Sequence, residues 1–81
     1  MSEELDRLAR AAAEYQESGR TVVEVAEWLV ANFPQLGDKP FNLAQVLRTA
    51  CALPVRDLQY ITAWAHGSIS RETLQDRLGP R

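Results

Sequence analysis

The sequence is poor in the residues that carry most enzymatic and metal chemistry. It holds one cysteine, Cys51, and one histidine, His66, among its 81 residues. A single cysteine excludes an intramolecular disulfide and a cysteine-rich metal site. Neither residue stands in a recognisable setting for a nucleophile with its general base. We therefore predict a protein that is not an enzyme and that has no catalytic residue, no metal site and no cofactor.

Glycine and basic charge are also scarce. The four glycines stand singly at turns, so no glycine-rich phosphate loop is present. The formal charge of −2 lacks the strongly basic balance of a typical nucleic-acid-binding domain. Apolar runs are only a few residues long, far below the roughly 20 that span a bilayer, and the first residues show no signal-peptide pattern. These absences favour a cytoplasmic protein without membrane contact and argue against nucleic acid as its partner.

What the sequence does contain is a helical pattern. Its 46% hydrophobic and 25% charged residues are typical of a folded globular protein. Apolar residues recur at spacings of three and four between clusters of turn residues, and no segment alternates as a β-strand does. The expected helices cover about residues 2–17, 21–33, 41–51, 53–67 and 70–78. We predict one all-α domain, residues 1–81, built as a compact orthogonal bundle of five short helices.

Several helix ends are marked by their residue types. Thr21 and Glu24 fit a capping box, in which each side chain binds a backbone N–H of the other. Pro34 is expected to end the helix that this capping box begins. Ser70 is the predicted N-cap of the last helix, and Gly79 marks its end.

The stretch LPVRDLQYITAWAHG, residues 53–67, predicts a buried face that excludes its largest side chains. The residues expected to face inward are Val55, Leu58, Ile61, Thr62 and Ala65. Tyr60 and Trp64 lie on the flank of this face, on the same side as Arg56. Trp28 likewise lies off the apolar face of its own segment.

These off-face residues are our candidate partner-binding residues. Exposed aromatic patches mark interaction sites, and Trp, Tyr and Arg dominate interface energies. The candidates are Trp28, Arg56, Tyr60, Trp64 and His66. His66 stands at the C-terminal end of the fourth helix, where it can interact with the helix dipole or form a pH-sensitive contact. The alternative for the aromatic residues is that a neighbouring helix covers them.

The function predicted from these observations is binding to another protein. Its most concrete form is an immunity, antitoxin-like or inhibitor protein, whose acidic charge would steer it toward a basic partner. A homo-oligomeric adaptor or scaffold, such as a homodimer formed through the same patch, is one alternative. The other is a helix-turn-helix-type regulator, with Arg71, Gln75 and Arg77 exposed on a recognition helix. A long proline-containing linker, residues 33–40, stands where that motif has a tight turn.

Residues 41–78 carry a local resemblance. Its main elements are Leu47-Arg48, Val55-Arg56-Asp57 and Ser70-Arg71-Glu72, with small residues between the first two. This stretch resembles the helical part of the C-terminal domain of the bacterial ribosomal stalk protein. The resemblance implies a helical hairpin that serves as a docking surface for proteins, and a small α+β fold as an alternative. Pro54 stands where that family has glycine.

Overall fold

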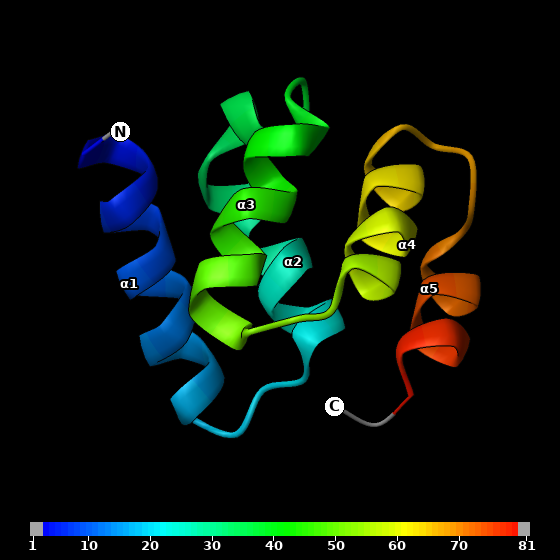
Figure 1. Ribbon diagram of the computed structural model, residues 1–81, viewed down its shortest axis with the longest axis horizontal. Coiled ribbons are helices and arrows are strands. Elements are labelled where there is room, and N and C mark those ends of the chain that lie inside the picture. Colours follow the sequence, from blue (N-terminus) through cyan, green and yellow to red (C-terminus); the bar gives the residue numbers. More distant parts are fainter. Residues whose placement is uncertain (1–2, 80–81) are drawn as a thin grey trace.

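The chain folds into the five predicted α-helices in a computed structural model that describes residues 3–79. The helices are α1 (Glu3–Glu17), α2 (Val22–Asn32), α3 (Pro40–Cys51), α4 (Val55–Ala65) and α5 (Arg71–Leu78), with a 3-10 turn, η1 (Pro34–Leu36), after α2 (Figure 1). No strand occurs in residues 3–79. The all-α prediction is therefore confirmed, and the α+β alternative is wrong.

Local side-chain chemistry fixes the start of two helices as the sequence predicts. The backbone N–H of Glu24 donates to Thr21 Oγ1 over 3.2 Å, and the N–H of Thr21 donates to Glu24 Oε1 over 3.0 Å. The capping box is thus complete. At α5, the N–H of Thr73 donates to Ser70 Oγ over 3.1 Å. Each hydroxyl satisfies a backbone donor that has no partner inside its helix.

The end of α3 shows a backbone conformation that the residue type does not favour. Ala52 follows Cys51 with φ 53° and ψ 46°, in the left-handed region that glycine usually occupies at this position. Its N–H still donates to the carbonyl of Arg48 over 2.9 Å. Two residues then join α3 to α4: Leu53, which is buried, and Pro54, which is the N-cap of α4.

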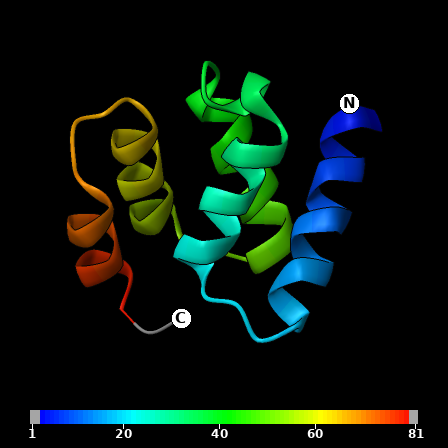
Figure 2. The ribbon, with the colours of Figure 1, turned by 180° about the vertical axis from the view of Figure 1, so that it is seen from behind.

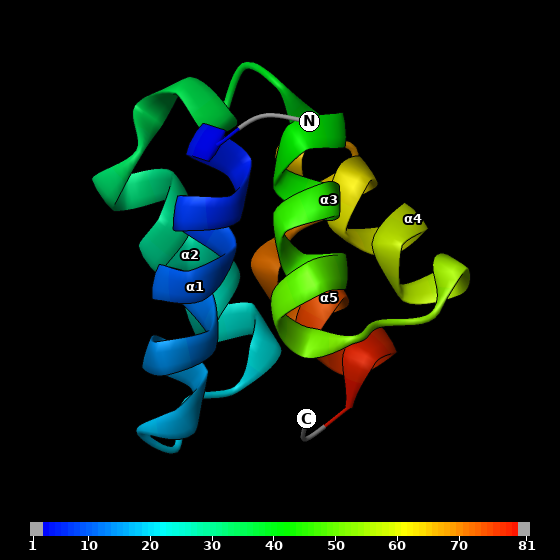
Figure 3. The same cartoon turned by 60° about the vertical axis from the view of Figure 1, so that its left-hand side comes forward.

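The helices form a closed ring of contacts in the order α1, α3, α4, α5, α2 and back to α1. Helix α3 also contacts α2, which lies behind it in Figure 1 and in front of it in Figure 2. Seen from the side, α1 and α2 lie together and α4 lies on the other flank of α3 (Figure 3). The core between them takes residues from every helix, including Leu8, Leu29, Leu47, Ile61 and Leu74.

The orientation of α4 differs from the prediction at Val55. Val55 was expected to face inward but is 66% exposed, whereas Asp57 in the first turn of α4 is buried. The buried side of α4 is set by Ile61, which is fully inaccessible. Six residues at about 100° each place Val55 roughly a third of a turn away from Ile61, so packing Ile61 into the core turns Val55 outward.

Candidate functional site

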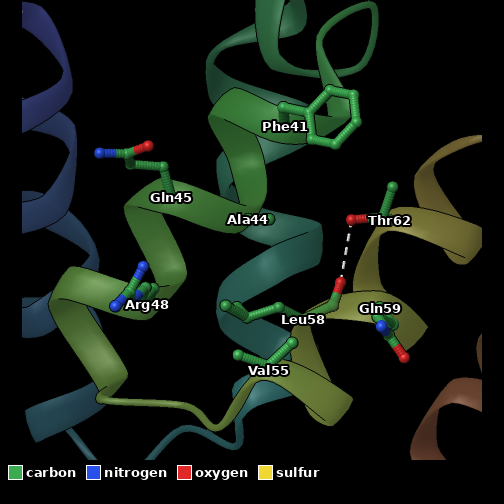
Figure 4. A pocket seen from close by; sticks show the side chains of 8 residues that line it. All are labelled: Phe41, Ala44, Gln45, Arg48, Val55, Leu58, Gln59 and Thr62. Atoms are coloured by element: carbon green, nitrogen blue, oxygen red, sulfur yellow. Dashed lines mark hydrogen bonds between the residues drawn. The ribbon is translucent and has the colours of Figure 1, made fainter.

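A groove between α3 and α4 holds the most exposed large apolar side chains of residues 3–79. Phe41 on α3 is 79% exposed and Val55 on α4 is 66% exposed. Both line one open groove of about 390 Å³ (Figure 4). The other lining residues are Ala44, Gln45, Arg48, Leu58, Gln59 and Thr62. We call this surface the α3–α4 groove.

The α3–α4 groove follows directly from helical spacing. Helix α3 contributes residues at i, i+3, i+4 and i+7, namely Phe41, Ala44, Gln45 and Arg48. Helix α4 contributes the same pattern, namely Val55, Leu58, Gln59 and Thr62. Residues at these spacings share one face of a helix. The groove therefore lies between two rows of side chains, one on each helix.

The floor of the groove is apolar and one end carries a positive charge. Ala44 is buried and Leu58 is partly buried. Thr62 Oγ1 donates to the carbonyl of Leu58 over 2.9 Å, so this hydroxyl is used within α4. Phe41 stands at one end of the groove, and Val55 and Arg48 stand toward the other (Figure 4).

The aromatic residues on α1 and α2 are arranged differently. The rings of Tyr15 and Trp28 stack with centroids 4.7 Å apart and planes 11° apart. Phe33 meets Trp28 edge to face with centroids 6.0 Å apart, and the guanidinium of Arg20 lies 5.4 Å from the centroid of Tyr15. Both geometries are favourable for aromatic side chains. We call Tyr15, Trp28 and Phe33 the aromatic cluster.

The structure separates the predicted partner-binding residues into two places. Arg56, Tyr60 and Trp64 follow one another along α4, and His66 is exposed at the C-cap of that helix. Arg56 is exposed, whereas Tyr60 and Trp64 are partly buried against the core. Trp28 lies on α2 and makes its ring contacts with Tyr15 and Phe33. A binding role for these residues stays a prediction.

Sequence reasoning missed Phe41 and Val55 because both fit an apolar helical face. A signal was nevertheless present in the sequence. The α3 segment is apolar over more than one face, and its buried residues already include Leu43, Val46 and Leu47. The helices α1, α2 and α4 pack against α3 and bury these residues, but they leave Phe41 exposed. Phe41, in the first turn of that helix, is the residue left outside.

The remaining side chains that could bind a metal, act as a nucleophile or bind an anion do not form a second site. Within residues 3–79, no three His, Cys, Asp or Glu side chains gather in a way that could hold a metal ion. Burial raises the pKa of the Cys51 thiol, which lowers its thiolate fraction at neutral pH. Arg71 Nε donates to Glu27 Oε2 over 2.7 Å, so its guanidinium pairs within the chain.

The lengths of the helices bear on membrane contact. None of those in residues 3–79 is long and apolar enough to cross a bilayer.

Comparison of the chain with protein-family models, with curated proteins and with solved structures found no match in any of the three. The resemblance of residues 41–78 to the ribosomal stalk protein therefore stays a prediction.

Proposed function

We propose that this chain is a non-enzymatic protein-binding domain whose α3–α4 groove binds one amphipathic helix of a partner protein. The observation that carries this proposal is the exposure of Phe41 and Val55 in a single groove. Isolated exposed apolar residues are ordinary on protein surfaces, whereas contiguous ones mark interaction sites. Here the two residues are joined by the apolar floor that Ala44 and Leu58 form.

The energetic argument concerns water around these side chains. Moving a phenylalanine or valine side chain from water into an apolar contact contributes about 1.5–3 kcal/mol. Folding leaves most of this free energy unused at Phe41 and Val55, because no element of residues 3–79 covers them. A partner that fills the groove would gain it.

The shape of the groove favours a helix as the occupant. Its lining residues span eight positions on each wall, 41–48 on α3 and 55–62 on α4, so it extends for about 10.5 Å at 1.5 Å per residue. Two turns of a partner helix cover that length. Such a helix would place apolar side chains at i and at i+3 or i+4 into the groove, as helix-in-groove complexes do.

An immunity, antitoxin-like or inhibitor role is one form of this function. In that form the bound helix belongs to a toxin or an enzyme, both proteins act in the cytoplasm, and binding abolishes the partner's activity. An assay of the purified partner with and without this protein would reveal that role.

The test of the proposed function compares three proteins in affinity capture from the source cells. They are the wild type, the groove variant Phe41→Ser/Val55→Ser, and a control variant, Glu17→Ser/Ala31→Ser, altered at exposed positions outside the groove. We expect a protein that the wild type and the control retain and that the groove variant loses. With that protein purified, the groove variant should bind at least about tenfold more weakly, since about 1.4 kcal/mol corresponds to a factor of ten. A partner that binds the folded groove variant with wild-type affinity would overturn the proposal.

A further inference from the structure

We infer that the helix bound in the α3–α4 groove is acidic and places a carboxylate against Arg48, two turns from the apolar side chain that covers Phe41. This inference rests on the proposed function and names the chemistry of the partner.

The first support is the distribution of charge along the chain. Residues 1–37 contain seven acidic and three basic side chains, whereas residues 38–81 contain four acidic and six basic ones. The formal charge of −2 thus combines an acidic first part with a basic second part. Between residues 40 and 65, which build the groove, Asp57 is the only acid, and it is buried. The charged side chains that α3 and α4 expose are Arg48 and Arg56.

The second support is the position of Arg48. It lines the groove, is exposed and makes no ion pair with residues 3–79, whereas Arg20 and Arg71 pair with glutamates at 3.5 and 2.7 Å. An exposed guanidinium beside an apolar groove can form a bidentate pair with a carboxylate. Such a pair becomes stronger when the bound helix removes water around it.

The distance between Phe41 and Arg48 on α3 predicts the spacing of the matching residues in the partner helix. Arg48 follows Phe41 by seven residues, which is about 10.5 Å along the helix. A helix that lies along the groove would match this distance with an apolar residue and an acidic residue seven positions apart. Arg56, next to Val55 on the outer side of α4, would add attraction for further acidic residues at the same end of the groove.

A second copy of the chain fits this surface less well. A two-fold interface brings the same patch of both copies together. Each copy would bring the exposed Arg48 and Arg56 to that interface and no exposed carboxylate, because Asp57 is the only acid of residues 40–65 and is buried. The interface would then lack the complementary charges that favour association. Nucleic acid also fits poorly, because the lining offers a single arginine among apolar and amide side chains and no basic stripe.

The experiment selects the partner's chemistry from a defined library. Displayed 16-residue helical peptides carry leucine fixed only at positions 5, 8 and 9, and every other position is drawn equally from Glu, Lys, Gln and Ala. Peptides are selected on the wild-type protein and depleted on folded Phe41→Ser/Val55→Ser. We expect the retained peptides to contain more Glu than Lys, with Glu enriched seven positions from a leucine. Equal use of the two, or an excess of Lys, would overturn the inference and leave the proposed function standing. If no peptide depends on the groove, the proposed function itself fails.

A second measurement assigns the preference to Arg48. Fluorescence anisotropy of the best peptide should show at least a fivefold weaker affinity for Arg48→Gln, and an affinity within twofold of the wild type for Arg77→Gln, which alters an exposed arginine on α5. Replacing the matching peptide Glu with Gln should remove the difference between wild type and Arg48→Gln. An unchanged affinity for Arg48→Gln would overturn the inference. So would a dimer in sedimentation analysis that Phe41→Ser abolishes, or displacement of the peptide by single-stranded DNA.

Discussion

The aromatic cluster on α1 and α2 and the groove on α3 and α4 are both rich in large apolar side chains, yet they are built in opposite ways. In the aromatic cluster, Trp28 stacks on Tyr15 and makes an edge-to-face contact with Phe33. In the groove, Phe41 and Val55 have no such cover. The difference teaches that aromatic content does not locate a binding surface. A binding surface is located by apolar side chains that the fold leaves exposed together.

The ring of helices explains why the two regions differ. Helix α2 packs against α1, and Trp28 lies on that side, where Tyr15 of α1 stacks on its ring. The α3–α4 groove lies between α3 and α4 (Figure 4), and α2 packs behind α3 in the view of Figure 1. The same chain thus uses one set of aromatic residues to hold its helices together and leaves another apolar pair available to a partner.

The largest expected effect is on stability, from Trp28→Ala in the aromatic cluster. Removing a core tryptophan costs about 3–5 kcal/mol, and partial exposure of Trp28 lowers our expectation to about 2–3 kcal/mol of unfolding free energy. Urea denaturation followed by circular dichroism measures it, with Trp28→Phe as the control that keeps an aromatic ring. Binding of a groove peptide should change less than twofold. If Trp28→Ala kept wild-type stability but no longer bound the groove peptide, the binding surface would lie on the aromatic cluster.

The next effect concerns the capping box that begins α2. Thr21→Ala should lower the unfolding free energy by about 1 kcal/mol, because the N–H of Glu24 loses its side-chain acceptor. Groove binding should again stay unchanged, because the capping box lies outside the α3–α4 groove.

The capping box also predicts a pH dependence. The hydrogen bond from the Thr21 backbone N–H lowers the pKa of the Glu24 carboxyl. The stability that the ionised Glu24 carboxylate contributes to the folded state is therefore fully present above the unfolded pKa of about 4.3. It is lost as the pH falls through the lower pKa of the folded state. The stability difference between wild type and Glu24→Gln should shrink between pH 5 and pH 2. A difference of equal size at both ends of that range would contradict this role for Glu24.

A gain of stability is expected at the turn that joins the two walls of the groove. Ala52 is exposed and holds a left-handed backbone, which costs an alanine about 1 kcal/mol more than a glycine. Ala52→Gly should therefore raise the unfolding free energy by about 0.5–1 kcal/mol, and Ala52→Val should lower it. Thermal denaturation of the two variants beside the wild type shows whether each substitution raises or lowers the stability. A glycine variant less stable than the wild type would rule out strain at this residue.

The smallest expected effect is on the stability of groove variants. Phe41→Ser should change the unfolding free energy by less than about 0.5 kcal/mol, since an exposed side chain contributes little to folding. The same denaturation assay as for Trp28→Ala makes the comparison direct. A loss above 1.5 kcal/mol would show that Phe41 belongs to the core, and the contrast between the two regions would disappear.

The features predictable from the sequence were those that neighbouring residues determine. The capping box at Thr21, the N-cap at Ser70 and the helix end at Gly79 depend on residues within one turn, and each was confirmed. The rotation of α4 depends on how Ile61 fits between other helices, which no local pattern contains. For that reason the exposure of Val55 and the burial of Asp57 were not foreseen. The same limit hid Phe41, because periodicity shows which residues are apolar and not which of them a neighbour covers.

The central claim is that the α3–α4 groove is the surface at which this protein binds a helix. Titrating the selected acidic peptide into ¹⁵N-labelled wild-type protein and following the backbone amide shifts tests it most directly. The account predicts that the largest changes fall within residues 41–48 and 55–62, and that the amides of Tyr15 and Trp28 stay near their free positions. Largest changes at Tyr15 and Trp28, with the groove amides unmoved, would contradict it.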